Sequence, residues 1–311
     1  MRELYAAVWR ATGRDQLLLI LLSLLVGALA ALPLKLQQLV INDLVYDGDL
    51  VWLAWLCAGF LAAVLASAGL KFVLGLRQAM VGERTVLRIR KTLYRNAVDR
   101  GEAAESGTLV AMMAAEAEAV GSFAGGAIAT PVLQLGTLVS VIGFIVASQP
   151  WLGLLALAVV LPQALIVLGL QERINRRVGE RVRALRAVSG RIATGDLAAA
   201  EPHIADGLAT IYAVRRRIFT LKLSSKLALS AISAAGKVGI LFLGGWLVVR
   251  GGTDVGTVVA SLSGLIRIEG PWRDLVSFFR VASTVRVQYG LLRPALEGVS
   301  GASATEAPGR A

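Results

Sequence analysis

The chain of 311 residues contains little cysteine, little histidine and little charge. Its single cysteine, Cys57, excludes an intramolecular disulfide framework. One cysteine and one histidine, His203, also leave no basis for a zinc site, which needs three or four Cys, His or carboxylate ligands. Only 17% of the residues are charged and 56% are hydrophobic, whereas a soluble domain has about 25% charged residues. The composition excludes intrinsic disorder and collagen-like repeats and indicates an integral membrane protein.

Long uncharged runs predict the membrane-spanning helices, because about 18 or more apolar residues are needed to cross a bilayer. The third and fourth runs are separated at Gln149-Pro150, since proline disfavours helix in the residue before it. The fifth run is interrupted only by Lys237, and the sixth is weak on hydropathy because charges follow from Arg267 onward. The predicted spans are residues 16–34, 50–70, 122–147, 151–170 and 227–249, and a sixth that begins near residue 256.

The net charge of +11 suggests a nucleic-acid partner at first sight, but the distribution of Lys and Arg argues otherwise. Most of the basic residues fall in residues 1–15, 71–118, 172–226 and 280–311. The remaining loops between the predicted spans contain almost no Lys or Arg. The positive-inside rule then places both termini in the cytoplasm with six spans. We therefore expect the chain to be embedded in a lipid bilayer, the inner membrane of a bacterium, and to bind no nucleic acid.

Two long basic segments, residues 71–118 and 172–226, are rich in helix formers. Apolar residues recur in them at broadly helical spacing, so each is predicted to form a cytoplasmic helical hairpin with one break. In the second segment we expect the break at Pro202, which would place His203 in a solvated turn. Two rigid hairpins of similar size suggest a docking surface for a partner.

Three stretches resemble the transmembrane domain of ATP-binding cassette (ABC) exporters. They are Gly107-Thr108-Leu109-Val110 through Glu116-Ala117-Glu118, then Pro150-Trp151-Leu152-Gly153 with Pro162, and Gly244-Gly245-Trp246 with Gly251, Gly256-Thr257 and Pro271. The resemblance implies an all-α membrane domain with six transmembrane helices and two long cytoplasmic hairpins over residues 1–297, followed by a flexible tail, residues 298–311. It also implies a pathway completed by a second transmembrane chain, because helices are exchanged between halves in this family; homodimer and heterodimer both remain open.

The sequence departs from the family at two places. The position of a usual Ser-Arg pair in the first coupling region reads Ala111-Met112, and the second coupling region around Glu201 is only an approximate match. The phosphate-binding motif G-x-x-x-x-G-K-[ST] of the family's ATPase domain is also absent from the sequence; the one Gly-Lys, Gly236-Lys237, is followed by Val238. We therefore expect that the chain is not an enzyme and binds no cofactor, and that ATP and Mg²⁺ are bound by a separate ATPase subunit.

Two sets of residues are candidates for function. The resemblance implies partner coupling by residues at the hairpin tips: Gly107, Leu109, Met112, Glu116, Glu201, Asp206 and Arg215. Charged residues inside the spans are candidates for the substrate pathway, because each costs roughly 2.5–3.5 kcal/mol at mid-bilayer. These are Lys237, Arg267, Glu269, Arg273 and Asp274.

Two interpretations of the intramembrane charges remain open. They could offer positive charge to an anionic or amphipathic substrate. Alternatively, the pairs Arg267–Asp274 and Glu269–Arg273, each on one face of a helix, could neutralise each other and hold helices together.

Three hypotheses for the whole chain follow. The first is a permease subunit of an ABC exporter with an unknown exported substrate. The second is a non-transporting scaffold or regulator of the same fold, and the third is an ion-coupled carrier that uses Lys237 and the charged residues of the sixth span.

Overall fold

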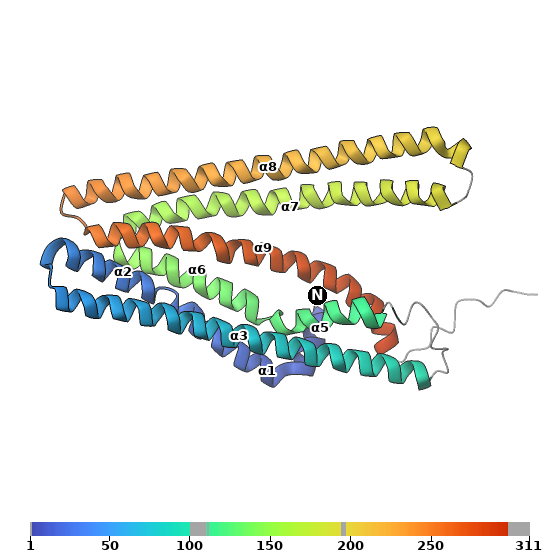
Figure 1. Ribbon diagram of the computed structural model, residues 1–311, viewed down its shortest axis with the longest axis horizontal. Helices are drawn as coiled ribbons and strands as arrows, with labels where there is room; N and C mark the ends of the chain where they lie inside the picture. The colour runs from blue at the N-terminus through green and yellow to red at the C-terminus, as the bar shows by residue number, and fades with distance from the viewer. Residues whose placement is uncertain (1, 100–109, 111, 194–196, 298–311) are drawn as a thin grey trace, which may run out of the picture. The chain divides into compact units, whose positions relative to one another are not determined.

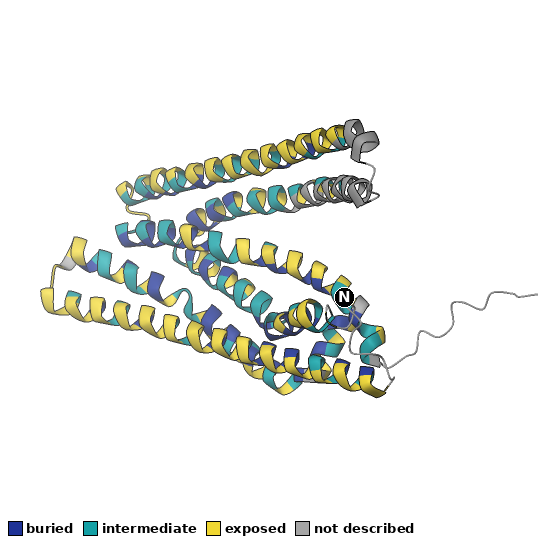
Figure 2. Ribbon diagram, turned by 45° about the vertical axis from the view of Figure 1, so that its right-hand side comes forward, coloured by how far each residue is buried: buried dark blue, intermediate teal, exposed yellow. Residues whose placement is uncertain are grey.

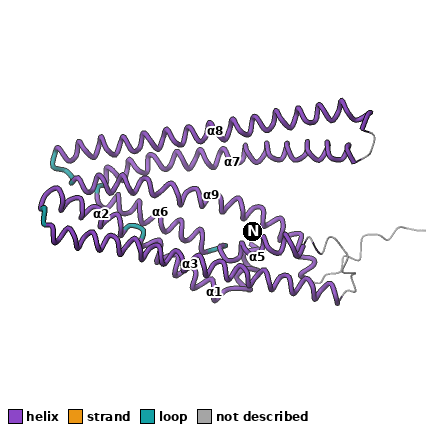
Figure 3. Tube along the Cα trace, in the orientation of Figure 1, coloured by secondary structure: helices purple, strands orange, loops and turns teal. Residues whose placement is uncertain are grey.

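The computed structural model describes residues 2–99, 110, 112–193 and 197–297, and within these residues all regular structure is helical (Figure 3). The long helices are α3, α7, α8 and α9, and each continues well beyond the length needed to cross a bilayer (Figure 1). In chain order the elements are α1 (Arg2–Leu29), α2 (Leu32–Asn42), the π-helix η1 (Asp43–Asp47), α3 (Leu50–Asp99), the π-helix η2 (Met112–Glu116), α5 (Ala117–Gly126), α6 (Ala129–Ser148), α7 (Pro150–Ala193), α8 (Leu197–Val249) and α9 (Val255–Glu297).

Five helical segments in the described part of the chain are long and apolar enough to cross a membrane. Only 11% to 33% of the most apolar window of each segment is buried inside the protein, and the exposed faces of α3 and α8 are visible in Figure 2, as expected for helices whose solvent is lipid. This confirms an integral membrane protein. The predicted sixth span lies in α9, which forms one helix through Pro271 but does not reach the same hydropathy. The five segments are Thr12–Tyr46, Leu50–Asp99, Met112–Ser148, Pro150–Val167 and Ala205–Val249.

The chain divides into two compact units. The first consists of Met1–Phe144 and Ile266–Ala311, and the second of Ile145–Leu265. In the first unit, a hydrophobic cluster joins α5 to the basic ends of α1, α3 and α9. Phe123 of α5 lies at its centre, stacked on Phe278 of α9 with ring centroids 5.6 Å apart and edge-on to Tyr5 of α1.

Glycines allow α3 and α5 of the first unit to pack unusually closely. A Cβ on Gly125 would lie 2.0 Å from the backbone oxygen of Gln78, and one on Gly121 would lie 2.4 Å from a methyl of Val86. Close approach of small residues is the usual way in which helices pack in membranes, because lipid tails provide little hydrophobic driving force between helices.

A polar network fixes the kink of α1 in the same unit. Thr12 leaves helical geometry at φ −136° and ψ 18°, and its Oγ1 donates to the carbonyl of Val8. The buried amide of Gln16 donates from Nε2 to Thr12 Oγ1 and to the carbonyl of Ala124 in α5, at 2.7 Å. The kinked segment of α1 therefore takes part in the hydrogen-bond network through which Gln16 joins α1 to α5.

The second unit is built on α7 and α8, which lie side by side along their lengths (Figure 1). Small residues again mark the contacts, since Gly236 of α8 lies against Val159 of α7 and Gly244 lies against Val258 of α9. Asp254 caps the first turn of α9: its Oδ1 accepts from the Thr257 N–H at 2.6 Å and its Oδ2 from the Thr257 hydroxyl at 2.8 Å.

The long helical extensions are confirmed, but the predicted break at Pro202 is wrong. The helix α7 ends at Ala193 and α8 begins at Leu197, so Pro202 and His203 lie inside α8. Pro202 is the sixth residue of α8, so the helix lacks the bond that an N–H at this position would donate to the carbonyl of Ala198, and it nevertheless continues through the proline. The sequence between the two helices is Thr194-Gly195-Asp196, whose glycine and cap-forming residues favour a helix end. The predicted tail, residues 298–311, lies outside the described residues.

Candidate functional site

The first candidate coupling region contains a π-helical turn, η2, immediately before α5. Met112 and Met113 of this turn are half-buried and pack against the hydrophobic cluster of the first unit. Glu116 is also half-buried, and its Oε2 has no hydrogen-bond partner within the part of the chain that the structure describes. Such π-helical turns are uncommon and often occur at functional sites. Two further predicted coupling residues, Gly107 and Leu109, lie outside the described residues.

A single arginine of α3 holds this turn in place. Arg90 donates from Nε to the carbonyl oxygen of Met113 at 2.8 Å, and its terminal nitrogen lies 3.4 Å from Oε2 of Glu118. The planar guanidinium therefore binds η2 and α5 at the same time, which a lysine could not do with the same geometry. The turn is thereby connected to the long helix α3.

The basic end of α9 is fastened by two neighbouring helices. Asn96 of α3 donates from Nδ2 to the carbonyls of Ala295 and Leu296, at 2.8 and 3.0 Å. Arg293 of α9 forms a 2.8 Å ion pair with Glu3 of α1. The last carbonyls of a helix have no partner within it, so Asn96 stabilises the end of α9 from outside.

The charged residues of α9 do not form the first predicted pair. Asp274 accepts a hydrogen bond from Gln134 Nε2 of α6 at 3.0 Å, and among the described ion pairs none joins it to Arg267. Arg267, Arg273 and Asp274 are exposed and Glu269 is half-buried. All four belong to the first unit, whereas Lys237 is half-buried in α8 of the second unit.

Of the predicted coupling residues in the second basic segment, Asp206 and Arg215 are exposed on α8. Glu201 lies in the second turn of the same helix, where the structure describes the backbone alone. The guanidinium carbon of Arg215 lies 5.7 Å from the ring centre of Phe219, one turn further along, at cation–π distance.

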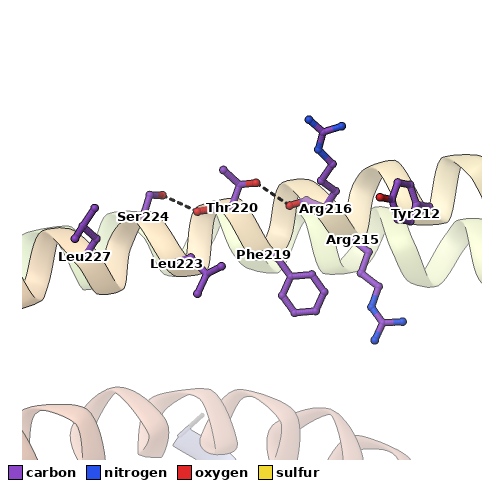
Figure 4. A pocket seen from close by; sticks show the side chains of 8 residues that line it. All are labelled: Tyr212, Arg215, Arg216, Phe219, Thr220, Leu223, Ser224 and Leu227. Atoms are coloured by element: carbon purple, nitrogen blue, oxygen red, sulfur yellow. Dashed lines mark hydrogen bonds between the residues drawn. The ribbon is translucent and has the colours of Figure 1, made fainter.

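Arg215 also lines a groove of about 700 Å³ along one face of α8. The lining residues come from successive turns of this helix, as Figure 4 shows. They are Tyr212, Arg215, Arg216, Phe219, Thr220, Leu223, Ser224 and Leu227.

Comparison with known protein families identifies the family of this chain. A family model described as the ABC transporter transmembrane region matches residues 17–200, more than half of the chain. The chain belongs to this family. A search among curated proteins finds no match. The family and the apolar helices together make it the transmembrane component of an ABC transporter.

The match to the ABC transmembrane region covers some of the sequence stretches on which the predicted resemblance was based, and not others. It includes the first coupling region and the Pro150 block, and it ends before the Gly244–Pro271 signature, the α9 charges and the α8 groove. Sequence reasoning missed Arg90, which binds the turn η2, and Asn96, which binds the end of α9. Each binds backbone carbonyls far along the chain, and neither forms part of a motif that would single it out.

Proposed function

We propose that this chain is the permease subunit of an ABC exporter, which forms the substrate pathway and is driven by an ATPase on another chain. The chain would span a bacterial inner membrane six times, with α9 as the sixth span and both termini in the cytoplasm. ATP and Mg²⁺ would be bound by the partner ATPase, since the printed sequence contains no phosphate-binding loop.

The observation that carries this proposal is the anchored coupling turn. In the family, the ATPase acts on the hairpin tips. Here Met112 and Met113 pack on a cluster that includes Val285 and Leu292 of α9, and Arg90 joins the turn to α3. A displacement of η2 would therefore be passed to α3 and α9 together, because packed side chains deform little.

The division into two units supports a second transmembrane chain. The pair α7–α8 makes its own compact unit with the ends of α6 and α9, as expected for helices that are exchanged between halves. The partner would be a second copy or a related chain, and the pathway would be lined by residues from both. Lys237, Arg267, Glu269, Arg273 and Asp274 are our candidates for the side chains that face it.

The test is a coupled ATPase assay on the native complex. We would tag the chain in its own cells, purify it in detergent with its associated proteins, reconstitute it in lipid nanodiscs and measure MgATP hydrolysis. Arg90→Ala should lower hydrolysis by at least about tenfold, since it removes a charge-assisted hydrogen bond and an ion pair at the coupling turn. The matched control is Arg95→Ala, an exposed arginine of the same helix, which should hydrolyse ATP as the unmodified complex does.

Two outcomes would contradict the proposal. A preparation without an associated ATPase would favour the scaffold or regulator, and transport driven by a proton gradient without ATP would favour the ion-coupled carrier. Equal loss of hydrolysis in Arg90→Ala and Arg95→Ala would show that the coupling turn has no special role.

A further inference from the structure

We propose that a small cavity between α1 and α3 binds the head group of phosphatidylethanolamine from the cytoplasmic leaflet. The lipid is a bound partner of the chain and not its cargo. The inference rests on the proposed topology only for the choice of leaflet, and its residues are distinct from those proposed for coupling and for the pathway.

The cavity lies within the first unit, where α1 and α3 contact each other (Figure 1). Its volume is about 20 Å³, which is enough for one group of the size of a water molecule. A primary ammonium group has this size, whereas a trimethylammonium group is much larger. The cavity therefore selects for a small polar group.

Three charged side chains line this cavity from two helices. Asp15 of α1 supplies one carboxylate, and Arg77 and Arg84 of α3 supply two guanidinium groups. The two arginines are separated by seven positions, so they lie within about 20° of each other on one face of α3. Among the hydrogen bonds and ion pairs of the described residues, none uses any of these three side chains. All three are therefore available to a ligand with charges of both signs.

The cavity lies at the level expected for lipid head groups. Asp15 is the last charged residue before the uncharged run of residues 16–34 in α1. Leu18 and Met80 line the cavity and are 41% and 48% exposed, so the cavity borders a surface that lipid covers. Large apolar side chains of α3 nearer the membrane, Phe72 and Leu76, are exposed as well. Arginine side chains at such a boundary extend toward the head groups.

The inner wall of the cavity is rigid. Leu19 of α1 and Val81 of α3 line it and are almost fully buried. Both belong to a hydrophobic cluster that also contains Leu74 of α3. Packed walls of this kind need little ordering when a ligand binds, so more of the interaction energy appears as affinity.

Phosphatidylethanolamine matches the charges and the size of the cavity. Its phosphate would lie between the two arginines, which bind phosphate oxygens in a bidentate manner. Its ammonium group would enter the cavity and donate to Asp15. Phosphatidylcholine has the same two charges, but its trimethylammonium group has no N–H to donate and exceeds the volume of the cavity. Phosphatidylglycerol supplies no cation for the carboxylate.

The experiment is a lipid competition that needs neither ATP nor the ATPase. The full chain would be purified and delipidated in detergent, then incubated with equimolar dioleoyl phosphatidylethanolamine and dioleoyl phosphatidylcholine. Native mass spectrometry would identify the first lipid that binds. We expect the ethanolamine lipid in at least about tenfold excess, because its ammonium makes charge-assisted hydrogen bonds that trimethylammonium cannot make. It should also exceed phosphatidylglycerol in a second mixture.

Two variants separate the contributions of the two head-group charges. Asp15→Asn should bring binding of the ethanolamine and choline lipids to within about twofold of each other, because it removes the charge that the ammonium contacts. Arg77→Gln/Arg84→Gln should weaken binding of both lipids at least about tenfold, because both contain the phosphate. The matched controls, Glu83→Gln and Arg95→Gln, change exposed residues of α3 that do not line the cavity, and should bind both lipids as the unmodified chain does.

The lipid comparison on the unmodified chain tests the inference even where a variant does not fold, and size-exclusion profiles would verify that the variants fold. Equal binding of the ethanolamine and choline lipids would overturn the inference and assign the cavity to a water molecule. A preference for phosphatidylglycerol would show that the arginines alone bind an anionic lipid. An unchanged preference in Asp15→Asn, or an equal change in Glu83→Gln, would overturn it as well.

These outcomes are independent of the proposed export function. Loss of the lipid preference with intact ATPase coupling would refute this inference alone. A preparation that shows the lipid preference but contains no associated ATPase would instead contradict the export function.

Discussion

The close approach of α3 and α5 predicts a strong penalty for one added methyl group. In Gly125→Ala the new Cβ would lie 2.0 Å from the backbone oxygen of Gln78, 3.0 Å from its carbonyl carbon and 3.1 Å from the nitrogen of Gly82. Real Cβ atoms essentially never come closer than 3.0 Å to such atoms, so the helices would have to separate by about 1 Å. The obstacle is backbone, which cannot rotate away as a side chain could.

The magnitude follows from two opposing effects. Overpacking typically costs about 1–3 kcal/mol, and a backbone obstacle places this site at the upper end. Replacing glycine by alanine inside a helix returns about 1 kcal/mol through helix propensity. The net loss should be about 2 kcal/mol, which lowers the apparent melting temperature by about 4–8 °C.

The assay is thermal unfolding of the detergent-solubilised chain, followed by fluorescence-detected size exclusion. The matched control is Gly75→Ala in α3, where an added Cβ meets nothing within 4 Å and only the propensity gain remains. The control should melt at or slightly above the unmodified chain. If Gly125→Ala did so too, α3 and α5 would not approach each other as described.

Three further predictions concern the ends of the helices. Asp254→Ala should destabilise the start of α9 by about 1 kcal/mol, and Asp254→Asn should retain most of the cap, as thermal unfolding would show. Asn96→Ala should speed proteolysis at the end of α9, which limited digestion and mass spectrometry would detect. Burial raises the pKa of Tyr5 above its ordinary value of 10.0. The folded chain therefore holds the tyrosine proton more tightly than the unfolded chain, and its stability should fall as pH rises past 10; Tyr5→Phe should reduce that fall in alkaline melting curves.

The spans were predictable because their signal is local. A run of uncharged residues has one low-energy form in lipid, a helix, and Pro150 is the first residue of α7 because the residue before a proline avoids helical geometry. The prediction of a helix break at Pro202 also rested on a local signal, and it failed. Pro202 does not interrupt α8, whereas the sequence Thr194-Gly195-Asp196 contains the residue types that favour a helix end.

The candidate sites were less predictable because they depend on distant pairings. Arg90 binds the carbonyl of a residue 23 positions later, and Asn96 binds one 199 positions later. Asp274 faces two possible partners in the sequence, Arg267 on its own helix and Gln134 on α6, and only the packing of α6 on α9 decides between them.

The fastening of α9 has a mechanical consequence. Because Asn96 binds the final carbonyls of α9 and Arg293 is bonded to Glu3, tension applied beyond Glu297 would not unwind that helix turn by turn. The load would be shared among three helices at once. A domain or subunit joined after Glu297 would therefore act on an anchored helix end. Even a small displacement there would be transmitted along α9 to the bilayer.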